Sequence, residues 1–173
     1  MYLNGKANSL ENGKAEIVQK IQNGEALEKF RQMVIFQGVD NDLASQLCKE
    51  PRSVLQLSSN VTSVCAKDDG YISNIKARVV GEVSAFGLGC GRRVPTDNVT
   101  HDTGIQIENH IGEKVEKGDT IFTVYHKEEK LANELKERLE NCVTIVPGKV
   151  KRKSRIDKIV GRDTPIGRVM ASQ

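Results

Sequence analysis

The first fifty residues carry apolar side chains at the spacing of amphipathic helices. Residues 10–24 predict one helix, and residues 24–38 predict a second with Gly38 as a left-handed exit. Asp40 can accept hydrogen bonds from the free N–H groups of a third short helix, and Pro51 prevents that helix from continuing. The positions predicted to face inward are Ile17, Val18, Ile21, Leu27, Phe30, Val34, Leu43, Ala44, Leu47 and Cys48.

After Pro51 the helical period gives way to short runs rich in Val, Ile, Thr and Ser, with Gly and Asp between them. The fold class is therefore α+β, and we place a domain boundary between residues 1–58 and 59–173. A tail begins at residue 147. Strands are predicted in residues 53–58, 60–66, 70–77 and 120–125, and Ile105 and Ile107 alternate with polar residues in the manner of a further strand. Residues 78–87 are ambiguous and favour a short buried helix ending near Gly87, and residues 127–142 predict a helix with Leu131, Leu135 and Leu139 four apart.

The composition is that of a globular domain with few aromatic side chains. The chain has 38% apolar and 28% charged residues, 4% aromatic residues and no Trp, so it has little with which to stack bases or rings. Its net charge is +3, and the basic residues concentrate in residues 149–158, which leaves the rest slightly acidic. We interpret this basic segment as a solvated tail rather than a nucleic-acid site, because no aromatic residues are interleaved with its charges.

No complete active site is visible in the sequence. The four cysteines, Cys48, Cys65, Cys90 and Cys142, lie far apart without C-x-x-C spacing, so we expect neither a metal nor another cofactor. No signal peptide and no apolar run of membrane-spanning length is present, which favours a cytoplasmic protein with reduced thiols.

The three histidines, His101, His110 and His126, are isolated, and we expect each to be exposed or satisfied by hydrogen bonds. His101 and Asp102 are an adjacent acid–base pair, but neighbouring strand residues point to opposite faces. We predict no catalytic residue.

The loop "AFGLGCGRRVPTD" at residues 85–97 combines three glycines with two arginines, which is typical of phosphate sites. The spacing of Gly87, Gly89 and Gly91 matches neither the dinucleotide fingerprint nor the P-loop. Pro95 also prevents a long helix from starting directly after the arginines. We therefore predict that the glycines end one helix and allow a tight turn.

Two stretches of the chain resemble thymidine and pyrimidine-nucleoside phosphorylases. Residues 88–126 resemble their C-terminal domain, and the helical residues "IVQKIQNGEALEKFRQMVIFQGVD" resemble the segment that precedes it. The matching positions in the first stretch are Gly89, Gly91, Arg92, Asp97, Gly104, Gly112, Val115, Gly118 and His126.

The resemblance implies a mixed β barrel-sandwich-like domain with two helices after the N-terminal helices, which would be the end of the large domain. It also implies a homodimeric pentosyltransferase that converts thymidine and phosphate to thymine and 2-deoxyribose 1-phosphate. The resemblance does not distinguish a preference for thymidine from a preference for uridine. Because the family's phosphate-binding and base-binding residues lie upstream of these stretches, we expect a C-terminal fragment that is inactive alone. The implied domain-closure loop comprises Gly87, Gly89, Gly91, Arg92, Arg93 and Asp97.

One alternative is a biotinyl- or lipoyl-like carrier or interaction module, since the turn "GEKVEKGD" at residues 112–119 also occurs in such domains. A carrier needs a modifiable Lys in an M-K-M or D-K-A triplet, and neither triplet occurs here. We also expect no specific nucleic-acid partner and no membrane.

Overall fold

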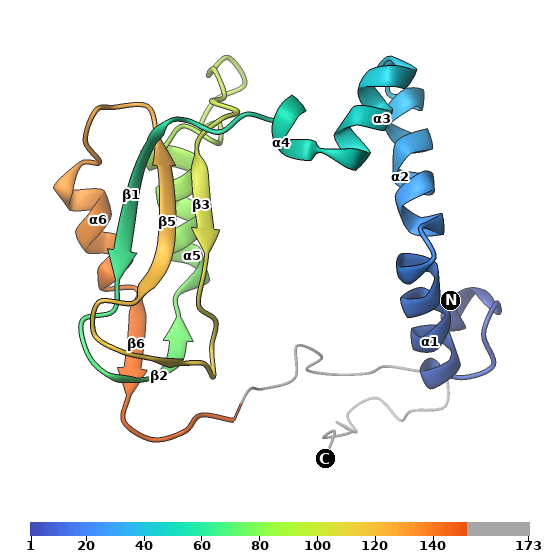
Figure 1. Cartoon of the computed structure of the whole chain (residues 1–173). Helices are drawn as coiled ribbons and strands as arrows, with labels where there is room; N and C mark the ends of the chain where they lie inside the picture. Colours follow the sequence, from blue (N-terminus) through green and yellow to red (C-terminus); the bar gives the residue numbers. More distant parts are fainter. Residues whose placement is uncertain (152–173) are drawn as a thin grey trace. The chain divides into compact units, whose positions relative to one another are not determined.

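A computed structural model describes residues 1–151 of the chain (Figure 1). The chain folds as two separate compact units, a first unit of Met1–Leu57 and a second unit that begins at Ser58. The predicted basic tail falls largely outside the described residues.

The first unit is entirely helical (Figure 1). Asp40 accepts from two amides before α3, as the sequence predicts, and Ser9, which was not predicted as a cap, accepts from the Asn12 amide before α1. Gly38 takes a φ of 94°, as the sequence predicts for a left-handed exit. The elements are a 3₁₀ turn (Tyr2–Asn4), α1 (Leu10–Gln22), α2 (Glu25–Phe36), α3 (Asn41–Lys49) and α4 (Pro51–Val54).

The apolar side chains of this unit are mostly not buried. Among its described side chains, Ala7, Val34 and Ala44 are the buried hydrophobic ones. Of the positions predicted to face inward, six are exposed, because no second layer of this unit covers them: Ile17, Val18, Ile21, Leu27, Phe30 and Leu43. The helices were predicted correctly, but the burial of these six side chains was wrong.

The second unit contains two antiparallel sheets of three strands each in its described residues. One sheet has the order β1-β5-β3, formed by Asn60–Cys65, Thr120–His126 and Gly104–Ile107. The other has the order β4-β2-β6, formed by Lys114–Val115, Gly70–Ile75 and Val143–Val146. Both sheets bring together strands that are distant in the sequence.

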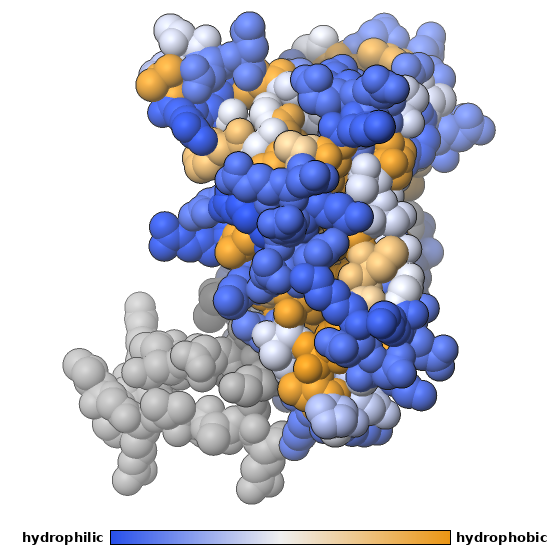
Figure 2. Space-filling view, turned by 90° about the vertical axis from the view of Figure 1, so that its left-hand side faces the viewer, coloured by the Kyte–Doolittle hydropathy of each residue, from blue (hydrophilic) through white to orange (hydrophobic). Residues whose placement is uncertain are grey.

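Two helices accompany the sheets, α5 (Ala77–Glu82), which runs on into a π-helical turn (Val83–Gly87), and α6 (Asn133–Glu140). Figure 2 shows a face of this unit on which hydrophilic side chains predominate. In α6 the Leu139 side chain is completely buried. The unit's core is formed by Val64, Ala66, Ile72, Val83, Leu88, Val115, Ile121, Phe122, Val124, Leu131, Leu139 and Cys142.

The observed class is α+β, as predicted, although the described strands form two open sheets and no closed barrel. The strand predicted at residues 53–58 is wrong: Pro51 occupies the first position of the short helix α4, where its missing N–H is tolerated, and no strand follows until Asn60. The helix predicted from residue 127 begins only at Asn133. The strands β4 and β6 were not predicted.

Candidate functional site

The candidate site is the segment from Val83 to Thr103, which we call the glycine–arginine loop. It starts in the π-helical turn Val83–Gly87, a widened turn that occurs often at functional sites. The widening continues beyond the turn, because the Cys90 and Gly91 amides donate to the carbonyls six residues earlier, Ser84 and Ala85, at 3.1 and 2.9 Å. The loop therefore leaves the core as a continuation of α5.

Two glycines are required by this path. Gly89 has a φ of 77°, a left-handed conformation that side chains with a Cβ rarely adopt. Gly91 lies so close to Ala85 that an added Cβ would come within 2.7 Å of the Ala85 Cβ. The glycines thus serve the tight turn, as the structural interpretation of the sequence predicts.

The base of the loop is fixed by a buried hydrogen-bond cluster. The Thr103 hydroxyl donates to the Leu88 carbonyl at 2.9 Å, and the Cys90 thiol lies 3.3 Å from both the hydroxyl and the carbonyl oxygen of Thr103. The Thr100 amide donates to the Gly89 carbonyl at 2.8 Å. These contacts join the two ends of the loop directly before β3. Thr103 was not among the predicted site residues, because its only signal in the sequence is that of a polar residue next to a predicted strand.

Asp97 organises the tip of the loop. Its Oδ2 accepts from the backbone amides of Arg93 and Val94 at 2.9 and 3.1 Å. These two hydrogen bonds, with a smaller contribution from the Arg93 charge, hold the pKa of Asp97 below its ordinary value. The Arg93 and Val94 amides are therefore already occupied by the loop's own carboxylate.

The two arginines at the tip are exposed and differ in their contacts. The Arg93 guanidinium lies 5.0 Å from the centroid of the Phe86 ring, within the range of a cation–π interaction. Arg92 makes no ion pair or side-chain hydrogen bond with any residue in the described part of the chain. The six predicted loop residues thus lie in one segment, on which the Arg92 side chain is exposed.

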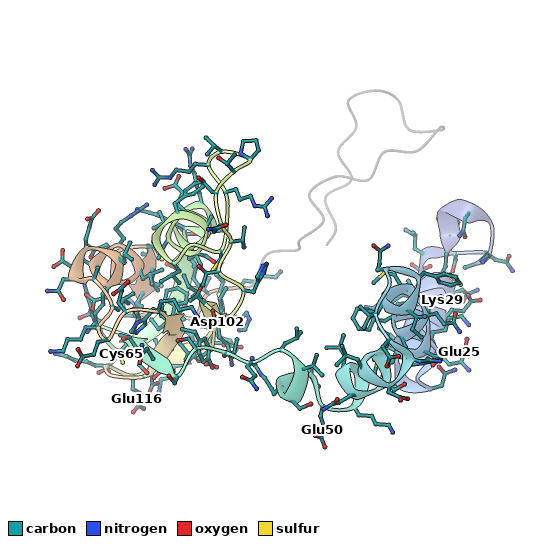
Figure 3. The ribbon with its side chains drawn as sticks, turned by 90° about the horizontal axis from the view of Figure 1, so that it is seen from above. Glu25, Lys29, Glu50, Cys65, Asp102 and Glu116 are labelled. Carbon is teal, nitrogen blue, oxygen red and sulfur yellow. The ribbon has the colours of Figure 1, made fainter. Side chains whose placement is uncertain are left out.

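The histidines do not form a catalytic group. His126 is buried, with its Nε2 2.8 Å from the Thr62 hydroxyl and its Nδ1 2.9 Å from the Glu128 carbonyl. His101 and His110 are exposed. Asp102, labelled in Figure 3, lies two residues before β3 and pairs with Lys127. The hydrogen bond from Lys127 is the largest cause that lowers the pKa of Asp102, and the charge of His101 contributes less.

Within residues 1–151, no three His, Cys, Asp or Glu side chains are placed to hold a metal ion. The four cysteines form no disulfide. No helix in the described part of the chain has the length and apolar character needed to cross a membrane.

The second unit belongs to a known class of domain. Residues 71–146, which include the whole glycine–arginine loop, match the pyrimidine nucleoside phosphorylase C-terminal domain. The sequence resemblance is thereby confirmed: this chain corresponds to a C-terminal part of a pyrimidine nucleoside phosphorylase.

The similarity extends beyond the domain into the first unit. The chain is 34% identical over 126 residues to the pyrimidine-nucleoside phosphorylase of Bacillus subtilis (strain 168), which is 73% of this chain and 28% of the relative. It is 33% identical over 140 residues to the enzyme of Staphylococcus epidermidis (strain ATCC 12228 / FDA PCI 1200), covering 81% of this chain and 31% of the relative. It is 29% identical over 145 residues to that of Staphylococcus aureus (strain USA300), covering 84% and 32%. The chain thus spans less than a third of the length of these relatives.

Proposed function

We propose that this chain supplies the C-terminal domain of an enzyme that cleaves pyrimidine nucleosides with phosphate. The observation that carries the proposal is the match of residues 71–146 to the phosphorylase domain. In the proposed reaction, a phosphate oxygen forms a bond to C1′ of the sugar while the C1′–N bond breaks, and the bond's electron pair leaves with the base. Thymidine and phosphate then give thymine and 2-deoxyribose 1-phosphate in a complete enzyme, which we expect to be a homodimer.

The role that we assign to the domain is closure over the reacting groups. Closing a domain excludes water and completes a polar site, which raises the strength of every electrostatic contact inside. The glycine–arginine loop suits this role because its base is fixed by Thr103 while its tip presents the exposed Arg92. Arg92 would then form a charge-assisted contact only in the closed state.

The chain alone is expected to be inactive, because positioning phosphate against the sugar and stabilising the leaving base supply most of the rate gain. The first test incubates the purified chain with thymidine and phosphate and measures thymine by chromatography. No thymine above the uncatalysed control is expected. Turnover by the chain alone would overturn the assignment of an accessory domain.

The second test uses a chimera, the Bacillus subtilis phosphorylase in which this chain replaces the aligned part. We expect the chimera to form thymine and Arg92→Ala to lower kcat/KM by about tenfold or more, the worth of one hydrogen bond to a charged group. Arg78→Ala is the matched control, because Arg78 is 91% exposed and pairs with Glu82 on the surface. An Arg92→Ala chimera with unchanged kcat and KM would show that the closure role is wrong.

A further inference from the structure

The first residue of the second unit is hydrogen-bonded to the glycine–arginine loop itself. The Ser58 amide donates to the carbonyl of Asp102, the residue directly before Thr103, at 2.7 Å. The half-buried Ser58 hydroxyl donates to the His126 carbonyl at 2.6 Å. Ser58 therefore joins the end of the loop to the end of β5, although the three residues lie far apart in the sequence.

The β5 side of this contact is held in place by further groups. Asn60, the first residue of β1, pairs with His126 in the sheet, and its side-chain amide donates to the Lys127 carbonyl at 2.9 Å. The His126 ring is buried, and both its nitrogens lie within hydrogen-bond distance of a partner. The Lys127 ammonium in turn pairs with the Asp102 carboxylate. We call Ser58, Asn60, Asp102, His126 and Lys127 the Ser58 cluster.

The loop side of the contact leads from Asp102 towards Arg92. Thr103 on one side of Asp102 and Thr100 on the other are both hydrogen-bonded to the outgoing half of the loop, Thr100 through its amide to the Gly89 carbonyl at 2.8 Å. Arg92 follows Gly89 by three residues. Because a hydrogen bond tolerates only small changes of distance and angle, a shift of Asp102 displaces the outgoing half of the loop or breaks these contacts.

We propose that Ser58 is a positioning residue for the glycine–arginine loop. Its amide and hydroxyl set the place of Asp102 relative to β5 and thereby the place from which the Arg92 side chain extends. This inference rests on the proposed function, in which Arg92 forms a contact in the closed enzyme, and it adds a residue that determines where Arg92 is presented. Ser58 acts through Arg92 and not on the substrate.

The first experiment measures hydrogen exchange of individual amides in the chain by NMR. Ser58→Ala removes the hydroxyl, so we expect the Thr100 amide to exchange about fivefold faster, the effect of one hydrogen bond of ordinary strength. Ser58→Thr keeps a hydroxyl and should retain the slow exchange. Ser73→Ala is the matched control, because the Ser73 hydroxyl also donates to a backbone carbonyl, that of Thr144, but in the other sheet.

Two results of this experiment would overturn the proposal. One is an unchanged exchange rate of the Thr100 amide in Ser58→Ala. The other is an equal acceleration in Ser73→Ala, which would mean that the Thr100 amide reports only the general stability of the second unit.

The second experiment is a double-mutant cycle in the chimera with the Bacillus subtilis phosphorylase. Ser58→Ala is expected to lower kcat/KM by about fivefold when Arg92 is present and to have no effect in an Arg92→Ala background, because no side chain is then left to position. Ser58→Thr should restore kcat/KM, and Ser73→Ala should leave it unchanged.

An equal loss of kcat/KM in both backgrounds would show that Ser58 only stabilises the fold, and it would overturn the proposal, as would the absence of any loss. A chimera that forms no thymine rejects the proposed function. The positioning of the loop by Ser58 is then decided by the exchange of the Thr100 amide in the chain alone, so the two failures are distinguishable.

Discussion

Replacing Thr103 with Val tests whether the buried hydrogen bond at the base of the glycine–arginine loop determines the order of the loop. The hydroxyl of Thr103, a residue that is 8% exposed, donates to the Leu88 carbonyl at 2.9 Å. Val has nearly the same shape as Thr but lacks the hydroxyl, so the change removes this donor without leaving a large cavity. The Leu88 carbonyl then remains in the interior without its Thr103 partner.

The expected cost follows from the burial of that carbonyl. An intramolecular hydrogen bond contributes about 1 kcal/mol net, and a buried acceptor left without a donor costs about 1–3 kcal/mol. We therefore expect Thr103→Val to lower the free energy of unfolding of the second unit by about 1–3 kcal/mol. This is a substantial part of the roughly 5–15 kcal/mol that stabilises an ordinary domain.

Urea unfolding measures this loss. In a Tyr2→Phe background, tyrosine fluorescence reports only Tyr71 in β2 and Tyr125 in β5, both in the second unit. We expect the urea midpoint to fall by about 1 M and hydrogen exchange of the Thr100 amide to accelerate. Thr96→Val, at an exposed loop position, is the control and should change neither quantity. A Thr103→Val protein with an unchanged midpoint and unchanged loop exchange would refute the reasoning.

Three further changes test other parts of the second unit. Gly70→Ala should destabilise it by about 1–3 kcal/mol in urea unfolding, because the new Cβ would lie 2.5 Å from the Val146 carbonyl oxygen, whereas Gly104→Ala meets no atom within 4 Å and should be nearly neutral; equal effects would contradict this. The pKa of Asp97 is lowered in the folded state, so the ionised Asp97 side chain stabilises the folded loop at a pH above the ordinary aspartate pKa. This stabilisation is lost as the pH falls through the pKa that Asp97 has in the folded protein. Exchange of the loop amides should therefore accelerate on acidification, and Asp97→Asn should abolish that pH dependence. His126→Phe should destabilise the unit by about 1–3 kcal/mol in the same urea assay, because the change removes the ring nitrogens that contact the Thr62 hydroxyl and the Glu128 carbonyl; an unchanged midpoint would argue against a structural role.

Much of the secondary structure was predictable because its signals are local. The cap at Asp40, the left-handed Gly38 and the run of β-branched and aromatic residues in β5 each depend on neighbours within a few positions. The short strands β4 and β6 were not predictable, because they form only where β2 provides hydrogen-bonding partners from distant positions. The burial of the apolar side chains of α1 and α2 was predicted wrongly, because a helical period shows which side chains share one face but not whether another part of the protein packs against that face.

The candidate site shows the same division. The sequence by itself determined the glycine–arginine loop as a segment and the glycines as turn residues. Wherever they occur, Gly widens and Pro narrows the range of backbone dihedral angles. Only the tertiary structure decided that Asp97 occupies the loop's own amides and that Thr103 joins its ends, since these contacts depend on how the chain returns from the tip of the loop to β3. Hydrogen bonds across a loop depend on its path through space, and that path is fixed by packing against the core rather than by the order of the residues.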